Sequence, residues 1–267
     1  MQIELKNLGP LKYANFSIGD LTIICGTNNT GKTYATYALY GFLQYWRETL
    51  NISVANDSIA ELLNHGTTSI NLVQYFKKAN DILKIGCQDY SERLSEVFAS
   101  SKEKFKDSSF SLTLSETDIK STVKFELIVS AVKADLFSMT KDEKSDELII
   151  TLLVAKESVK IPEASIHRVI GDAIKEILFG HLFPNPFIAS AERTGAAIFR
   201  KELNFERNRL LKEMSKNGDN FDPIDLLINP IQDFALPVRD NVDFTRKLES
   251  VSRNESFIKN LHPELNG

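Results

Sequence analysis

Residues 26–33 decide the expected fold, and they read Gly26-Thr27-Asn28-Asn29-Thr30-Gly31-Lys32-Thr33. They match the pattern G-x-x-x-x-G-K-[ST], the P-loop, in which backbone wraps a phosphate group. A chance match somewhere in a chain of this length has a probability of roughly one in a hundred. An apolar run over residues 21–25 precedes the motif, and a helix-forming run follows it. The motif is therefore expected between a buried strand and a helix, where a P-loop belongs.

The residue types of the motif suit phosphate chemistry. Its glycines let the backbone approach a phosphate without a Cβ clash, and its N–H groups can point at phosphate oxygens beside a helix N-terminus. Lys32 would contact the β- and γ-phosphates of ATP, and the Thr33 hydroxyl would bind Mg²⁺. The candidate nucleotide-binding residues are Gly26, Thr27, Asn28, Asn29, Thr30, Gly31, Lys32, Thr33 and Tyr34. The alternative is a glycine-rich strand-to-helix turn with an exposed lysine.

Composition excludes several classes of protein. The chain has 267 residues, a formal net charge of −4, 42% hydrophobic residues and 25% charged residues. These ordinary values exclude a disordered or collagen-like chain, and the mildly acidic balance argues against bulk coating of nucleic acid. No stretch is apolar enough for a transmembrane helix, and the N-terminus is unlike a signal peptide. Two cysteines are too few for a disulfide framework. We therefore expect a cytoplasmic protein with no membrane partner.

The remaining pattern predicts an α/β fold: a P-loop core with an antiparallel β part and a helical insertion. Two alternating strands are expected before residue 21. Residues 33–47 are apolar almost all round, which predicts a helix buried on most faces. The expected ranges are 1–56 for the first strands, the motif and the first helix, 57–106 for a helical insertion, 107–160 for an antiparallel β segment, and 161–267 for the return to the core and C-terminal helices.

Shorter elements are expected within these ranges. The insertion should hold three helices, the second of them spanning Ile70 to Leu83. An acidic run over residues 141–147 predicts a solvated hairpin. The last range should hold a helix over 163–182, a buried strand over 187–191 and a charged helix over 195–216.

An NTPase also needs an acidic residue at the end of a second apolar strand, where it holds Mg²⁺ and orients water. The nearest candidate is Glu192, so Lys32 and Glu192 are the candidate catalytic residues. Arg193 could contact phosphate or a partner subunit. The alternative is a structural ion pair at a strand end. Guanine specificity is not expected, because the near match at residues 140–143 has Glu143 where the motif needs aspartate.

Other residues have two interpretations. Tyr13 or Phe16 could stack on adenine, but core packing is the expectation. Lys12 could contact phosphate but is expected in solvent, and Cys25 is expected to be a small buried hydrophobe. Basic residues interleave with glutamates on the expected helix after residue 195, which favours a solvated face over a DNA contact. These basic residues are Arg200, Lys201, Arg207, Arg209 and Lys212.

Two segments resemble a known group of proteins. Residues 1–45 resemble the start of ABC-type ATPases of the RecF, SMC and OLD-like branch, in which two antiparallel strands precede the P-loop strand. Residues 186–199, PFIASAERTGAAIF, resemble the strand-plus-arginine segment of bacterial ATPases in that group, many of them in phage-defence systems. The resemblance implies ATP and Mg²⁺ as cofactors, and a composite site shared with a second copy or with a complementary ATPase or nuclease subunit. It also implies a possible role on nucleic acid.

The sequence departs from that group at its end. A Ser-Gly-Gly-type signature, an apolar strand ending in Asp-Glu and a following histidine are missing. In the group these elements come after the arginine segment, so the resemblance implies the N-terminal portion of a longer ATPase. Exposed apolar sheet edges would then make the chain poorly soluble without a partner. Two other classes stay open: a nucleotide-binding sensor or interaction subunit without hydrolysis, and a small-molecule kinase.

Overall fold

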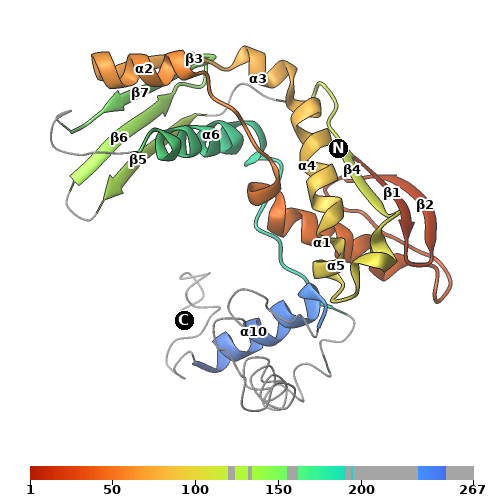
Figure 1. Ribbon diagram of the computed structural model, residues 1–267. Coiled ribbons are helices and arrows are strands. Elements are labelled where there is room, and N and C mark those ends of the chain that lie inside the picture. The colour runs from red at the N-terminus through yellow and green to blue at the C-terminus, as the bar shows by residue number, and fades with distance from the viewer. Residues whose placement is uncertain (120–123, 132–133, 155–161, 191–193, 195–233, 251–267) are drawn as a thin grey trace, which may run out of the picture.

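A computed structural model describes residues 1–119, 124–131, 134–154, 162–190, 194 and 234–250. The described chain is a mixed α/β fold with two antiparallel sheets, which confirms the expected fold class (Figure 1). In chain order the elements are β1 (Gln2–Leu8), β2 (Leu11–Ser17), α1 (Lys32–Thr49), α2 (Asn56–His65), β3 (Thr67–Asn71), α3 (Val73–Lys77), α4 (Ala79–Glu92), α5 (Leu94–Val97), the 3₁₀ helix η1 (Lys102–Phe105), β4 (Ser109–Thr113), β5 (Phe125–Ala131), β6 (Ala134–Lys141), β7 (Glu147–Leu152), α6 (Glu163–Phe179) and α10 (Leu236–Ser250).

The first sheet has the strand order β2-β1-β4. Strand β1 alternates as its sequence predicts, because Ile3 and Leu5 are fully buried while Lys6 is exposed. Ile3 lies opposite Phe16 of β2, in register for a hairpin that turns at Gly9. Gly9 has φ 57°, a left-handed value that favours glycine. The two strands expected before residue 21 are therefore confirmed.

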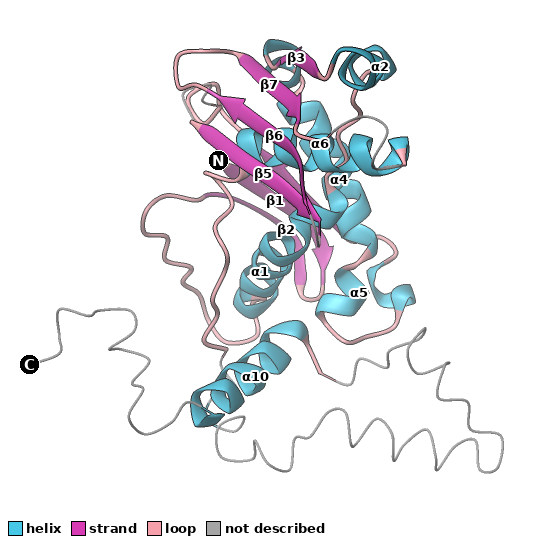
Figure 2. Cartoon of the chain, turned by 90° about the vertical axis from the view of Figure 1, so that its left-hand side faces the viewer, coloured by secondary structure: helices cyan, strands magenta, loops and turns pink. Residues whose placement is uncertain are grey.

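Helix α1 is buried on most of its surface, as its apolar sequence predicts. Its buried residues include Ala38, Phe42 and Trp46 on one face and Tyr37 and Tyr40 on the opposite side. The ring of Phe42 contacts three other rings, those of Tyr90, Phe110 and Phe183. These contacts join α1 to α4, to the first sheet and to the segment after α6, so α1 lies at the centre of the core (Figure 2).

Two glycines allow α1 and α4 to pack closely. A Cβ on Gly41 of α1 would lie 2.5 Å from the Tyr90 hydroxyl of α4. A Cβ on Gly86 of α4 would lie 2.1 Å from Cδ2 of Leu50. Tyr90 uses the space beside Gly41 to donate a hydrogen bond to the carbonyl oxygen of Ala38, at 2.5 Å. Any larger residue at either glycine would push the helices apart.

Helix α4 covers the open edge of the first sheet. The Ser91 hydroxyl accepts a hydrogen bond from the backbone N–H of Phe110 in β4, at 3.0 Å. The Asn80 side chain accepts from the N–H of Leu114 at 2.9 Å and donates to its carbonyl oxygen at 3.0 Å. Side chains of one helix thus replace the neighbouring strand that β4 lacks on this side, which satisfies its backbone groups.

The second sheet has the order β3-β7-β6-β5, and α2 and α6 cover one of its faces (Figure 1). Met139 and Ile150 lie opposite each other and are fully buried, whereas Ile149 is half exposed. Helix α2 ends at Gly66, whose φ of 77° closes the helix with a bond from its N–H to the Leu62 carbonyl oxygen. The solvated hairpin expected between β6 and β7 is also present.

The sheets join segments that are far apart in the sequence. Strand β4 pairs with β1, and β3 pairs with β7. Helix α6, which covers the second sheet, also contacts α1. Glu176 of α6 forms an ion pair with Arg47 near the end of α1, at 3.2 Å.

Several expected elements differ from the structure. Residues 21–25 form no strand, and Leu21 and Ile23 are 82% and 74% exposed. Residues 187–190 form no strand either; residue 191 and the expected helix 195–216 lie outside the described residues. The expected helix from Ile70 to Leu83 was wrong at its start, where Ile70 lies in β3. In each case local periodicity gave no information on which distant segment would be available as a pairing partner.

We predict that Asn80→Ala lowers the free energy of unfolding by about 1–2 kcal/mol, because the backbone of Leu114 loses both of its hydrogen bonds to that side chain. Urea denaturation measures the change. Gln88→Ala, at an exposed site on the same helix, is the control and should change stability by less than about 0.5 kcal/mol. Equal effects of the two substitutions would show that α4 does not support β4 in this way.

Candidate functional site

The P-loop residues form an exposed turn that enters α1. Asn29 and Gly31 have φ values of 63° and 90°, in the left-handed region that asparagine tolerates and glycine favours. The Thr30 hydroxyl donates to the carbonyl oxygen of Thr27 at 2.9 Å, which closes the turn. The turn geometry that the motif predicts is therefore present, although the segment before it is not a strand.

The β1–β2 hairpin packs against the end of the loop and the first turn of α1. Gly31 is buried, and a Cβ there would lie 2.4 Å from Cγ of Leu11, the first residue of β2. A Cβ on Gly9 would lie 2.4 Å from the ring of Tyr34, in the first turn of α1. The Tyr34 ring also stacks on Phe98, with centroids 4.9 Å apart. These contacts hold the base of the loop against the sheet.

The first turn of α1 is suited to an anion. Gly31 occupies the N-cap position and, among the described residues, no side chain caps the N–H groups of this turn. The turn also holds no acidic residue. Free N–H groups and the helix dipole together attract phosphate at such an end.

The Lys32 side chain folds back over the loop. Its ammonium donates to the carbonyl oxygens of Gly26 and Thr27, at 2.9 and 2.6 Å. An ammonium held by two neutral carbonyls can exchange them for phosphate oxygens, which are charged and bind it more strongly. The Thr33 hydroxyl is on an exposed residue at the same end of α1 and is the type of oxygen ligand that Mg²⁺ accepts. The residues present therefore fit a magnesium-bound nucleoside triphosphate.

Other predicted residues have mixed outcomes. Phe16 is half-buried against the core and Lys12 is exposed, as expected. Tyr13 was wrongly expected in the core, since it is 56% exposed on the outer face of β2 and its hydroxyl donates to Glu4 at 3.0 Å. Cys25 was wrongly expected to be buried; it is exposed because residues 21–25 have no partner strand among the described residues.

The candidate catalytic residue Glu192 and its neighbour Arg193 lie outside the described residues. In the part of the chain that the structure describes, no three His, Cys, Asp or Glu side chains gather where they could hold a metal ion. No described helix is long and apolar enough to cross a membrane.

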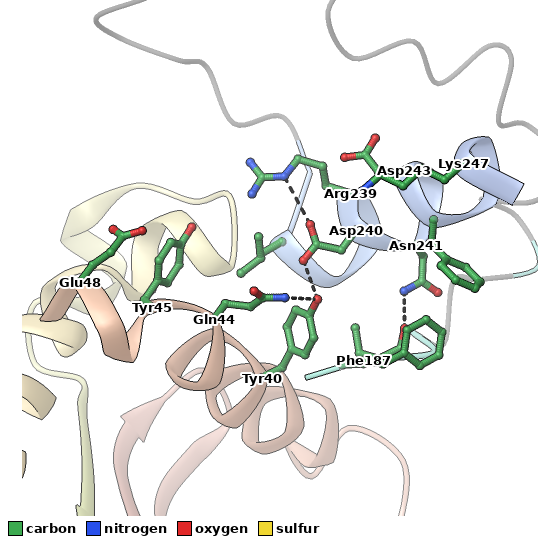
Figure 3. Close-up of a pocket in the computed structure, with 13 residues that line it drawn as sticks. Tyr40, Gln44, Tyr45, Glu48, Phe187, Arg239, Asp240, Asn241, Asp243 and Lys247 are labelled. Carbon is green, nitrogen blue, oxygen red and sulfur yellow. Dashed lines mark hydrogen bonds and ion pairs between the residues drawn. The ribbon is translucent and has the colours of Figure 1, made fainter. Parts of the chain in front are cut away.

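A second site lies between α1 and α10, a helix in the range where C-terminal helices were expected, although its bounds were not predicted. It is a pocket of about 440 Å³ lined by Tyr40, Gln44 and Glu48 on one face of α1, by α10, and by Phe187 and Ile188 (Figure 3). The signal that could have found α10 is Pro237 in its first turn, followed by polar residues around Val242, which is fully buried.

Hydrogen bonds hold α10 in place. The Tyr40 hydroxyl donates to Asp240 at 2.6 Å and accepts from Gln44 at 2.8 Å (Figure 3). The Asn241 side chain donates to the carbonyl oxygen of Ile188 at 2.6 Å and accepts from the N–H of Ser190 at 3.2 Å. Burial raises the pKa of the Asp240 carboxyl, although the Tyr40 hydrogen bond and nearby Arg239 oppose that shift. This arrangement fastens α10 and the segment after α6 onto the helix that carries the P-loop.

Comparison with known proteins identifies one family. A family model described as an AAA ATPase domain matches residues 1–231. No curated protein matches the chain. No solved structure matches it either.

We predict that Gly31→Ala destabilises the protein by roughly 2–4 kcal/mol, because it adds a clash with Leu11 to the strain of a left-handed φ. Gly66→Ala is the control: its φ of 77° is also left-handed, but no atom lies within 4 Å of the added Cβ. It should cost only about 1–2 kcal/mol. Chemical denaturation compares the two, and an equal loss would exclude the Leu11 contact as the cause.

We predict that Asp240→Asn raises the melting temperature by a few degrees at about pH 7 and has no effect at about pH 3, below the ordinary carboxyl pKa. The raised pKa of Asp240 means that its favourable contribution is complete below the ordinary carboxyl pKa and is lost as pH rises through the folded value. Thermal melts at both pH values measure this. Asp243→Asn, in the same pocket, removes the same charge, so an identical pH response would contradict the prediction.

Proposed function

Because the chain belongs to the family of AAA ATPase domains, we propose that it binds ATP together with Mg²⁺ at residues 26–33. One observation carries this proposal: the uncapped N-terminus of α1 meets the Lys32 ammonium across a glycine-containing turn. Both features attract phosphate oxygens, and both come from one short segment.

Each residue of the loop has a proposed role. The backbone N–H groups of residues 29–33 bind phosphate oxygens, with Gly26 and Gly31 providing the backbone freedom that this requires. Lys32 moves from the carbonyls of the loop to the β- and γ-phosphates. The Thr33 hydroxyl binds Mg²⁺, which would supply charge neutralisation at those phosphates. Tyr34 positions the first turn of α1 through its packing on Phe98.

We further propose that the protein is an ABC-type ATPase of the RecF, SMC and OLD-like branch, with a role in phage defence or on DNA. The layout of two antiparallel strands before the P-loop and the arginine-containing segment 186–199 support this assignment. In this proposal Glu192 orients water for hydrolysis, and Arg193 contacts phosphate or a partner subunit. The assignment rests on the resemblance, which is an argument by analogy.

A partner is proposed for the complete site. Apolar side chains lie exposed beside the loop and after α6, with Leu21, Ile23 and Phe187 at 82%, 74% and 68% exposure. Exposed apolar surface of this kind favours association. A second copy or a complementary ATPase or nuclease subunit would cover it and contribute to a composite site.

We predict that Lys32→Ala weakens Mg·ATP binding roughly 10- to 100-fold, since a charge-assisted hydrogen bond contributes about 1.5–3 kcal/mol. Calorimetric titration measures binding, and a phosphate-release assay on the same samples measures turnover. Thr33→Ala should bind ATP but lose most of the Mg²⁺ dependence. Lys77→Ala, at an exposed site on α3, is the control and should bind normally.

The outcomes separate the two classes of function. Lys32-dependent binding with phosphate release supports an ATPase. Lys32-dependent binding without release favours the nucleotide-binding sensor or interaction subunit. Absence of binding by a folded wild-type chain would refute both.

A further inference from the structure

A groove of about 600 Å³ runs between α4, η1 and the outer side of β1 and β4. Its volume lies in the range of ordinary ligand sites. The side chains that matter here are Lys6, Lys84, Lys102, Lys106, Ser109 and Ser111. None of the residues that line it belongs to the P-loop or to the pocket between α1 and α10.

The groove is positively charged in a chain whose net charge is −4. Four lysines line it, against two glutamates, Glu4 and Glu92. Lys6 pairs with Glu4 at 2.7 Å, so this lysine is already partly neutralised. Lys84, Lys102 and Lys106 are exposed and form no ion pair with any described residue. Three cations are therefore available to a ligand.

Hydrogen bonds connect the elements that form the walls of the groove. The Ser91 hydroxyl joins α4 to β4 through the N–H of Phe110, and the Ser108 hydroxyl joins the end of η1 to β1 through the carbonyl oxygen of Asn7, at 2.5 Å. Lys84 of α4 and Lys106 at the end of η1 thus line the groove from two elements that are both bonded to the first sheet. A preformed site loses little conformational entropy when it binds.

The floor of the groove offers neither a reactive thiolate nor an aromatic ring on which a base could stack. Cys87, Phe105 and Phe110 close it and are at most 9% exposed. Burial raises the pKa of the Cys87 thiol to about 12, so no reactive thiolate is present there. The two buried phenylalanine rings cannot act as stacking platforms for a base. What the groove offers is ammonium groups and the hydroxyls of Ser109 and Ser111, which suit phosphate oxygens.

We propose that this groove is a second anion site, distinct from the P-loop, that binds a phosphate-bearing ligand through Lys84, Lys102 and Lys106. The phosphate could belong to a free polyphosphate or to the backbone of a nucleic-acid strand. Both sources present the same oxygens to the same lysines, and the experiment distinguishes them.

The test uses the Lys32→Ala chain, so that phosphate binding at the P-loop does not obscure the result. Inorganic tripolyphosphate and a short single-stranded oligonucleotide of mixed sequence are each titrated at low salt. Lys84→Gln, Lys102→Gln and Lys106→Gln are then added together. The matched control adds Lys77→Gln, Lys78→Gln and Lys104→Gln, which removes the same charge from exposed lysines outside the groove. Lys104 is an especially close control because it lies between Lys102 and Lys106 in the sequence.

We expect the groove variant to bind at least one of the two probes tenfold more weakly or worse, while the control variant changes by less than twofold. For the oligonucleotide, the slope of log affinity against log salt should also fall by about 2, since three phosphate contacts are lost. A groove effect with tripolyphosphate alone identifies a free phosphate ligand, and one with the oligonucleotide identifies a strand. Equal weakening in both variants, or no binding of either probe by the folded parent, would overturn the proposal. Because the parent already lacks Lys32, the result of this test does not depend on whether the P-loop binds ATP.

Discussion

The burial of α1 on most of its surface is the constraint on which the rest of the structure depends. The P-loop lies at the N-terminus of this helix, so the helix must be fixed in position if its N–H groups are to stay oriented toward a bound phosphate. Here Phe42 contacts rings from α4, β4 and the segment after α6, and Tyr90 donates to the Ala38 carbonyl inside the helix. The close crossing with α4 that these contacts need is possible because Gly41 and Gly86 have no side chains.

The same packing sets the position of the loop itself. Leu11 fills the space that a side chain at Gly31 would need, and Tyr34 fills the space at Gly9. The hairpin and the first turn of α1 therefore define each other's position by steric fit. The loop between residues 26 and 31 stays exposed above that base, where a ligand can reach it.

Helix α4 both covers the edge of β4 and lines the basic groove. Asn80 and Ser91 satisfy the free edge of β4, which would otherwise be open to pairing with another chain. Its exposed side, with Lys84, forms one wall of the basic groove. Both features follow from its alignment along β4, which brings residues 19 to 34 positions apart in the chain into contact.

The sequence by itself determined the elements whose signals are local. The P-loop turn, the buried helix after it, the first hairpin and the end of α2 at Gly66 follow from glycine positions and from apolar periodicity, and the structure has them all. Tertiary structure alone decided which strands pair. The apolar residues 21–25 have the composition of a buried strand yet pair with no strand in the described part of the chain, while Ile70, expected in a helix, pairs with Leu148 of β7. It also decided that α10 lies against α1 and that lysines from three separate segments share one groove. The reason is physical: a strand or a site is stabilised by neighbours that are distant in sequence, and local periodicity contains no information about which neighbours will be there.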